Sequence, residues 1–166
     1  MVRRAVPADA AEVTRLRRLM FESMGLDCDA VDWEPACVAF FEARFGTADV
    51  VGAVADAPDG DGLAACGVIE LSRQIPSPRA RRGTNAYIST ISTDPRWRRR
   101  GLAAAVMDDL LEVARAAGID NVDLHATAEG RPLYERLGFR ERPGNPALRL
   151  ALTSTTTGPD RSTLTP

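Results

Sequence analysis

The stretch Ile88-Ser-Thr-Ile-Ser-Thr-Asp-Pro-Arg-Trp-Arg-Arg-Arg-Gly-Leu-Ala-Ala-Ala-Val-Met107 decides the fold of this 166-residue chain. Its first six residues are rich in β-branched side chains, which suit a pleated strand. Asp94 and Pro95 then end the strand, because proline has no N–H to give to a sheet. After Gly101 the apolar residues recur with helical spacing, starting at Leu102. The stretch therefore predicts a strand, a sharp turn and a helix that packs on the sheet.

The turn between this strand and this helix is a candidate anion site. The first N–H groups of a helix have no partner inside the helix, and the helix dipole adds partial positive charge there. Gly101 lets the backbone approach a ligand closely, and the arginines before it can fork onto phosphate oxygens. The turn lacks the Gly-Lys-Ser/Thr of a P-loop and the Gly-x-Gly-x-x-Gly of a dinucleotide site. It therefore predicts pyrophosphate binding by Arg98, Arg99, Arg100, Gly101, Leu102 and Ala103.

Two motifs, in the right order, resemble the GNAT N-acetyltransferase family. Arg98-x-x-Gly101-x-Ala103, after a strand that ends in Thr-Asp-Pro, is similar to the family's acetyl-CoA pyrophosphate loop. Leu133-Tyr-Glu-Arg-Leu-Gly-Phe139 is similar to its Leu-Tyr-Glu-Lys-Leu-Gly-Phe signature. The resemblance extends more loosely over residues 2–152, which is nearly the whole chain.

The resemblance implies an α/β (α+β) protein with the GNAT fold. We expect a mixed central sheet of about seven strands flanked by about four helices. In that fold the cofactor cleft lies between the fourth and fifth strands, which splay apart. Residues 1–152 then form a single acetyltransferase domain, and residues 153–166 form a disordered tail rich in serine and threonine.

Local patterns predict the order of the elements. Helices are expected from residue 7 through an apolar stripe that includes Met20, and over residues 33–45, 101–118 and 128–137. Strands are expected over residues 2–5, 49–55, 63–71, 85–93 and 121–127, then after residue 140, and over 147–152.

Composition restricts the function classes. The net charge of −2 argues against general nucleic-acid binding. The sequence has no run of 18 apolar residues for a transmembrane helix, and no apolar segment follows the N-terminal arginines as in a signal peptide. Cys28, Cys37 and Cys66 lack metal-ligand spacing and predict reduced thiols. We therefore expect a cytoplasmic protein that binds no metal, no nucleic acid and no membrane.

The resemblance implies how the cofactor, acetyl-CoA, is held and used. Backbone at a bulge in the fourth strand, near Ile91, Ser92 and Thr93, binds the pantetheine arm and the thioester carbonyl. Thr127 stands where the family often has an asparagine that contacts this arm, and its hydroxyl can replace that contact. Tyr134 matches the family's general acid, since a phenol can protonate the departing thiolate. The alternative for Tyr134 is core packing beside its apolar neighbours.

The residues that deprotonate and bind the acceptor amine carry weaker signals. Glu70 ends an otherwise apolar, buried face of the third strand, so it is a candidate general base, directly or through a water. The alternative is a solvated residue at a fraying strand end. His125, the only histidine, lies on the polar side of the fifth strand and is a weaker candidate. Asp27 and Asp29 belong to an acidic loop that either attracts a cationic amine or is simply solvated.

These features predict an acetyl-CoA-dependent N-acetyltransferase that transfers its acetyl group directly, in a ternary complex, to a primary amine. The acceptor is a small molecule, cationic if the acidic loop binds it, or a peptide, and the resemblance allows a homodimer. The alternative is a non-catalytic CoA-binding regulatory or scaffold module on the same fold. An O-acyl or longer-acyl transferase also stays open. An acyl-enzyme on a cysteine is not expected, because the sequence pairs no base with a thiol.

Overall fold

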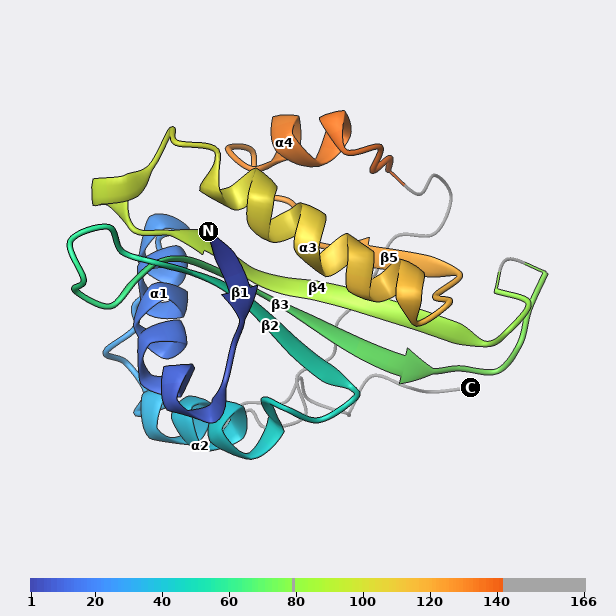
Figure 1. Cartoon of the computed structure of the whole chain (residues 1–166), viewed down its shortest axis with the longest axis horizontal. Coiled ribbons are helices and arrows are strands. Elements are labelled where there is room, and N and C mark those ends of the chain that lie inside the picture. Colours follow the sequence, from blue (N-terminus) through green and yellow to red (C-terminus); the bar gives the residue numbers. More distant parts are fainter. Residues whose placement is uncertain (79, 142–166) are drawn as a thin grey trace, which may run out of the picture.

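A mixed five-stranded sheet with helices on both faces forms the body of the computed structural model, which describes residues 1–78 and 80–141 (Figure 1). The strands are β1 (Val2–Arg4), β2 (Val50–Asp56), β3 (Leu63–Arg73), β4 (Thr84–Thr93) and β5 (Asn121–Leu124), in that spatial order. The helices are α1 (Ala10–Ser23), α2 (Glu34–Arg44), α3 (Leu102–Ala116) and α4 (Arg131–Arg136), with short 3₁₀ turns at Pro7–Asp9 and Pro95–Trp97. Neighbouring strands are antiparallel except β4 and β5, which are parallel and are connected by α3.

This architecture confirms the predicted mixed α/β fold and corrects several boundaries. β3 continues to Arg73 rather than residue 71, because its last two residues still pair with β4. β5 ends at Leu124 rather than residue 127, and α4 begins at Arg131 rather than residue 128. The described residues hold five strands instead of about seven, since the sixth and seventh predicted strands and the tail at 153–166 lie outside them. The single domain over residues 1–152 stays a prediction.

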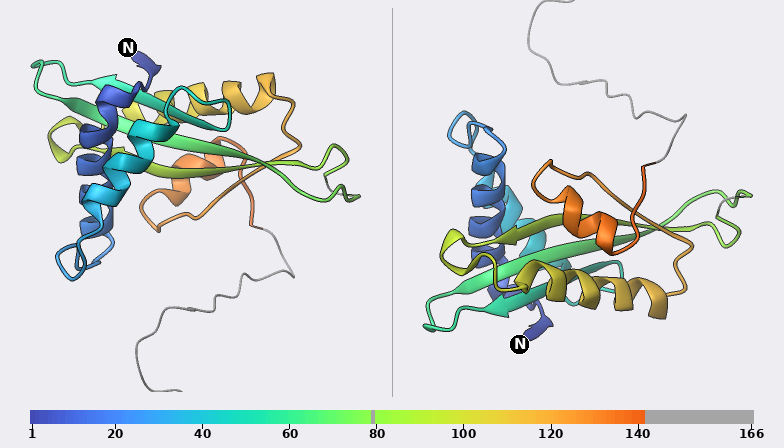
Figure 2. Two further views of the ribbon diagram at one scale, coloured as in Figure 1. Left: turned by 90° about the horizontal axis from the view of Figure 1, so that it is seen from below. Right: turned by 90° about the horizontal axis from the view of Figure 1, so that it is seen from above.

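Alternation along the strands sends side chains to two cores, one on each face of the sheet. Cys66 and Val68 of β3 pack with α1 and α2. Ala65 and Ile69 of the same strand pack with α3. Figure 2 shows α3 on one face of the sheet and α1 and α2 on the other. Strand alternation along β3 therefore divides its buried side chains between the two cores.

A β-bulge interrupts β4. The residues of β4 on either side of the bulge pair with Cys66 and Val68 of β3, so Thr90 and Ile91 together face Gly67 alone. Thr90 has a φ of 57°, which a β-branched residue rarely adopts. A Cβ at Gly67 would meet Ile91 Cδ1 at 2.5 Å and a side-chain atom of α3 at 2.6 Å. Glycine is therefore needed on β3 for the bulge and α3 to pack this closely.

β4 and β5 pair only along the first half of β4. The parallel ladder runs from Asn85, paired with Asn121, to Ile88, paired with Leu124, where β5 ends. β4 continues past the bulge to Thr93, so within the described residues its second half has no strand beside it on that edge. The predicted splay between the fourth and fifth strands is confirmed, and it opens a cleft.

Candidate active site

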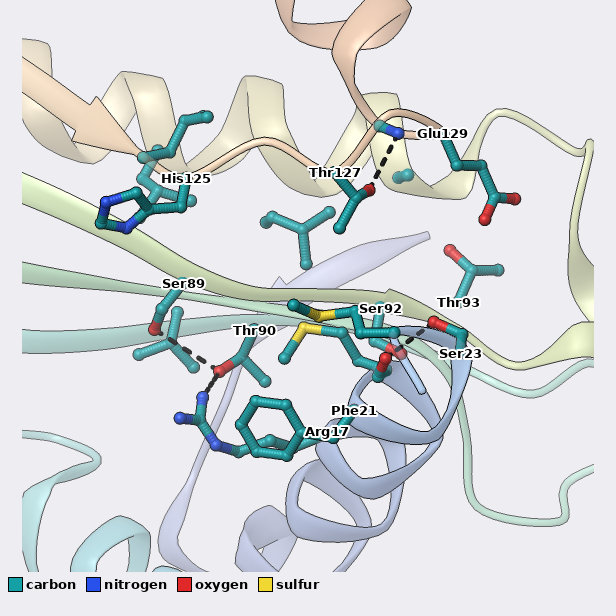
Figure 3. Close-up of a pocket in the computed structure, with 18 of the residues that line it drawn as sticks. Arg17, Phe21, Ser23, Ser89, Thr90, Ser92, Thr93, His125, Thr127 and Glu129 are labelled. Atoms are coloured by element: carbon teal, nitrogen blue, oxygen red, sulfur yellow. Dashed lines mark hydrogen bonds between the residues drawn. The ribbon is translucent and has the colours of Figure 1, made fainter. Parts of the chain in front are cut away.

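A cleft of about 1530 Å³ runs through the splayed end of the sheet. Figure 3 shows part of its lining, with Arg17 and Phe21 on one side of β4 and Thr127 and Glu129 on the other. We call the part lined by α3, α4 and the turns that precede these helices the α3 half. The part lined by α1, α2 and β3 is the α1 half.

The α3 half ends at an uncapped helix N-terminus. Gly101 is the N-cap of α3 with a φ of 78°, and no described side chain caps the first N–H groups of this helix. A Cβ at Gly101 would meet nothing within 4 Å, so a ligand can approach the backbone there. Leu102 and Ala103 line the cleft in the first turn of the helix. This geometry suits a bound anion.

Asp94 holds the turn that leads to this helix. Its buried carboxylate accepts hydrogen bonds from the Arg96 backbone N–H at 2.9 Å and from the Arg15 guanidinium of α1 at 3.0 Å. Burial alone would raise the pKa of Asp94, but the hydrogen bonds from Arg96 and Arg15 outweigh it and lower that pKa. The turn is therefore anchored to α1 by a charged, hydrogen-bonded group.

Two of the three arginines predicted to bind phosphate line the cleft. Arg98 and Arg99 lie at its α3 end, where Arg98 Nη1 is 3.7 Å from Glu129 Oε1. Arg100 instead stacks over Trp97, with its Cζ 4.7 Å from the ring centroid, and is not part of the lining. The turn through Arg99, which has a φ of 60°, separates Arg98 from Arg100. The structure thus brings two of the predicted cations to the site and directs the third away.

The bulge of β4 forms the middle of the cleft. Ile91, Ser92 and Thr93 line it, but the bulge itself lies at Thr90 and Ile91, slightly earlier than predicted. The Ser92 hydroxyl is used inside the protein, because it donates a hydrogen bond to the Leu16 carbonyl of α1 at 2.8 Å. Backbone groups released from the ladder by the bulge, rather than the Ser92 side chain, are therefore what this segment offers a ligand.

Tyr134 enters the cleft from α4. The residue is only 9% exposed, and its ring packs edge-on against Phe139 with centroids 6.1 Å apart. Burial raises the pKa of the Tyr134 phenol, so the hydroxyl keeps its proton at neutral pH. Nearby, Thr127 Oγ1 accepts a hydrogen bond from the Gly130 N–H at 3.1 Å. That bond uses an oxygen lone pair, so the Thr127 hydroxyl can still donate to a ligand.

Glu70 lines the cleft beside a hydrogen-bonded pair of aromatic side chains. It lies opposite Tyr87 in the ladder between β3 and β4, and the Tyr87 hydroxyl is 2.6 Å from His125 Nδ1. The face of the third strand predicted a buried Glu70, but Glu70 is exposed. The helices on that face leave its position uncovered. Sequence reasoning missed Tyr87, although strand alternation places it on the same half-buried side of β4 as Ser89.

The structure does not bring Asp27 and Asp29 into the cleft. Asp29 Oδ1 is 2.6 Å from Arg18 Nη2, and Asp27 Oδ1 accepts a hydrogen bond from the Asp29 backbone N–H at 3.0 Å. Neither carboxylate is part of the lining, since the loop after α1 folds back toward Arg18. The cation that pairs with this acidic loop is therefore supplied by the protein itself.

Arg17 is a charged residue of the α1 half that sequence reasoning missed. It lies on α1, lines the cleft and donates a hydrogen bond to Thr90 Oγ1 at the bulge. A signal was present, because Arg17 shares one helical face with Met20, Phe21 and Met24. A cation within an apolar helical stripe indicates a position at which the charged group has a specific partner, as Arg17 has in Thr90.

The cysteines of this chain are free thiols, and two of them are poor nucleophiles. Burial raises the pKa of the Cys66 thiol to about 12, and Cys66 Sγ donates to the Thr90 carbonyl at 3.5 Å. Burial also raises the pKa of Cys28.

In the part of the chain that the structure describes, no group of three or more His, Cys, Asp or Glu side chains is placed to hold a metal. No helix of that part is long and apolar enough to cross a membrane.

The fold and the cleft define a class of protein, in which a cleft runs from the bulge of a splayed sheet to the uncapped N-terminus of a helix. The Acetyltransferase (GNAT) family matches residues 12–139, and this chain belongs to that family. The fold is similar to that of a predicted acetyltransferase with acetyl-CoA from Clostridium acetobutylicum. The TM-score is 0.79 at 22% identity, over 90% of this chain and 95% of that chain.

Two curated relatives are similar over part of the sequence. The glucosamine 6-phosphate N-acetyltransferase of Trypanosoma brucei brucei is 38% identical over 65 residues, which are 38% of this chain and 44% of that protein. The mycothiol acetyltransferase of Beutenbergia cavernae is 37% identical over 84 residues, which are 49% of this chain and 26% of that protein. The chain thus matches less than half of the length of either relative.

Proposed function

We propose that this protein is an acetyl-CoA-dependent N-acetyltransferase that transfers the acetyl group directly to a primary amine. The observation that carries the proposal is one cleft that joins the uncapped N-terminus of α3 to the bulge of β4. An extended ligand with a pyrophosphate at one end and a thioester at the other fits such a cleft. Membership of the family and the names of both relatives support the same chemistry.

The residues of the α3 half fit acetyl-CoA, which supplies an activated thioester when bound. The backbone N–H groups of Leu102 and Ala103 and the guanidinium groups of Arg98 and Arg99 would hold its pyrophosphate. The open space at Gly101 lets phosphate oxygens approach the backbone. The released backbone of the bulge would pair with the pantetheine arm as an added strand.

Two proton transfers are assigned to side chains of the cleft. Tyr134 keeps its proton at neutral pH, so it serves as the general acid for the departing thiolate. Glu70 serves as the general base for the amine, through a water because it is exposed. His125, held by the Tyr87 hydroxyl at 2.6 Å, is the second candidate base in the same part of the cleft. No thiol is required, so transfer takes place within a ternary complex.

The acceptor is a small-molecule amine or a peptide. One relative is named for glucosamine 6-phosphate and the other for mycothiol, both of which are small molecules. Because the chain matches less than half of either relative, these names support a size class and not an identity. The free thiols support a cytoplasmic location.

Calorimetric titration with acetyl-CoA tests cofactor binding. The wild type is expected to bind with micromolar affinity, and the Arg98→Ala/Arg99→Ala double variant should bind about ten- to a hundred-fold more weakly. Arg100→Ala is the matched control, because Arg100 stacks on Trp97 outside the cleft, and it should bind as the wild type does. A wild type that gives no binding heat would refute the proposal.

Thiol release with a panel of amines then separates catalysis from binding. An enzyme should release CoA only when a suitable amine is present, because transfer is direct. Binding of acetyl-CoA without thiol release for any amine would favour the second candidate, a non-catalytic CoA-binding regulatory module on the same fold.

A further inference from the structure

Arg17 places a positive charge in the α1 half of the cleft, beside the bulge. Figure 3 shows its side chain reaching from α1 toward Thr90, with the Phe21 ring next to it. Arg17 Nη1 donates a hydrogen bond to Thr90 Oγ1, and its Cζ lies 4.8 Å from the Phe21 ring centroid. The side chain is half-buried, so these two contacts fix the guanidinium where a ligand in the cleft would meet it.

Arg17 differs from its arginine neighbours on α1 because it has no counter-ion among the described residues. Arg15 pairs with Glu12 and Asp94, and Arg18 pairs with three carboxylates. Within residues 1–78 and 80–141, Arg17 pairs with no carboxylate. Its hydrogen bond at the bulge uses one of the five N–H donors of a guanidinium, so the others are available to a ligand.

In the described part of the chain, the surroundings of Arg17 do not neutralise its charge. Glu70 lines the same half from β3 but forms no ion pair with Arg17 in the described part of the chain. The wall beside Arg17 is largely apolar, and it includes Met24 and Leu26, which are 50% and 53% exposed. A charge fixed against apolar walls attracts an opposite charge more strongly than it would in open solvent.

We propose that Arg17 binds an oxyanion of the acceptor, a carboxylate or a phosphate, that lies a few bonds from the reacting amine. This rests on the proposed function, because it requires the amine to reach an acyl group held at the bulge. Arg17 is hydrogen-bonded to Thr90 of the bulge itself, so an oxyanion on Arg17 lies next to that amine. This closeness favours a carboxylate on the amine-bearing carbon, as in an α-amino acid. The apolar walls of α1 and α2 then face the rest of an apolar acceptor.

Arg17 calls for a negatively charged group on the acceptor, whereas the acidic loop predicted a cationic acceptor. Asp29 of that loop is already paired with Arg18, outside the cleft lining. An acceptor with several positive charges would place one of them near Arg17, where like charges repel. The cation of the α1 half, rather than the acidic loop, therefore selects the acceptor.

Steady-state acetylation of matched amines tests this selection. Each pair consists of an apolar α-amino acid and its decarboxylated amine, such as phenylalanine and phenethylamine, and phosphoethanolamine supplies a phosphate. The wild type should use phenylalanine with a kcat/KM about ten-fold or more above that for phenethylamine. Arg17→Gln should raise the KM for phenylalanine about ten- to a hundred-fold and change neither phenethylamine kinetics nor the KM for acetyl-CoA by more than about two-fold.

Two further variants separate ligand binding from a structural effect. Arg18→Gln is the matched control, because Arg18 is the next residue of α1 and pairs with carboxylates outside the cleft. It should keep the preference for the carboxylate. Arg17→Lys keeps the charge without the planar fork, so its KM for phenylalanine should lie between those of the wild type and Arg17→Gln.

The outcomes distinguish the inference from the function on which it rests. A kcat/KM for phosphoethanolamine above that for phenylalanine, which Arg17→Gln removes, would identify the oxyanion as a phosphate. Equal use of phenylalanine and phenethylamine, unchanged in Arg17→Gln, would overturn the inference and leave the acetyltransferase activity standing. If the wild type acetylates none of these amines, phenylalanine is titrated into the CoA complex. Binding heat that Arg17→Gln abolishes would then support the oxyanion site, and no heat would overturn it.

Discussion

Replacing Tyr134 by phenylalanine separates a catalytic role from a packing role, because the change removes only the hydroxyl. The ring keeps its place in the cleft wall and its edge contact with Phe139. Within the described residues the hydroxyl has no hydrogen-bond partner, so its removal leaves no buried group unpaired. We therefore expect the free energy of unfolding near neutral pH to stay within about 0.5 kcal/mol of the wild type.

The expected loss of catalysis is much larger than this change in stability. A positioned general acid contributes about 10²- to 10⁴-fold to a rate, or about 3 to 5 kcal/mol of transition-state stabilisation. Because the Tyr134 phenol is assigned to the departing thiolate alone, kcat should fall by that factor. The Kd for acetyl-CoA should stay within about two-fold of the wild-type value.

The pH dependence of stability gives an independent check on the burial of this phenol. Burial raises the pKa of Tyr134 in the folded state above its ordinary value of about 10. The resulting stability is fully present below pH ~10 and is lost as the pH rises through the folded-state pKa. Thermal unfolding of the wild type and of Tyr134→Phe should therefore coincide at neutral pH. Above pH ~10 the variant should become the more stable protein, since it has no phenol to ionise.

Thiol release at saturating acetyl-CoA and thermal unfolding are measured on the same preparations. Phe139→Leu is the matched packing control, because it removes the ring contact and keeps the Tyr134 hydroxyl. It should lower the free energy of unfolding by about 1 kcal/mol and keep most of kcat. A Tyr134→Phe variant with the wild-type kcat would refute the assignment, and the residue would then serve only to pack the cleft wall.

Three further changes test the site and its frame. Glu70→Gln should lower kcat about 10²-fold in thiol release without weakening acetyl-CoA binding, whereas an unchanged kcat would leave the base role to His125 or water. Gly67→Ala should destabilise the fold by about 1–3 kcal/mol in chemical denaturation, because the new methyl meets Ile91 Cδ1 at 2.5 Å. An unchanged free energy of unfolding would show that the bulge can shift to accommodate the methyl group at little cost. Asp94→Asn should cost about 1–3 kcal/mol near neutral pH. This cost should shrink as the pH falls below about 4 and through the lowered folded-state pKa of Asp94, and an equal cost at every pH would contradict the charged anchor.

The strand, turn and helix at residues 88–107 can be predicted from the sequence because their signals are local. Asp94 and Pro95 follow the end of β4, and Gly101 before α3 adopts a left-handed conformation that glycine tolerates. The strand end and the helix start are each determined by a few neighbouring residues. The two faces of β3 follow from strand alternation in the same way, which is why the division into two cores is also predictable.

The features that local patterns do not predict depend on residues far apart in the sequence. The bulge at Thr90 has no glycine or proline of its own, and it relies on Gly67 of β3 for close packing. The acidic loop pairs with Arg18, eleven residues before Asp29, so its charge is already used. Arg17 and Thr90 are 73 residues apart, and only the folded chain shows that they meet.

Two arginines of α1 contact β4 or the turn that follows it, and their partners differ in chemistry. Arg15 donates to the Asp94 carboxylate at the turn, and Arg17 donates to the Thr90 hydroxyl at the bulge. A carboxylate neutralises a guanidinium, so Arg15 fastens the helix to the turn and presents little net charge to the cleft. A hydroxyl accepts the hydrogen bond and leaves the charge in place. The same helix can therefore anchor the turn before α3 with one arginine and, two residues further along, offer an acceptor a cation that no carboxylate of the described residues neutralises.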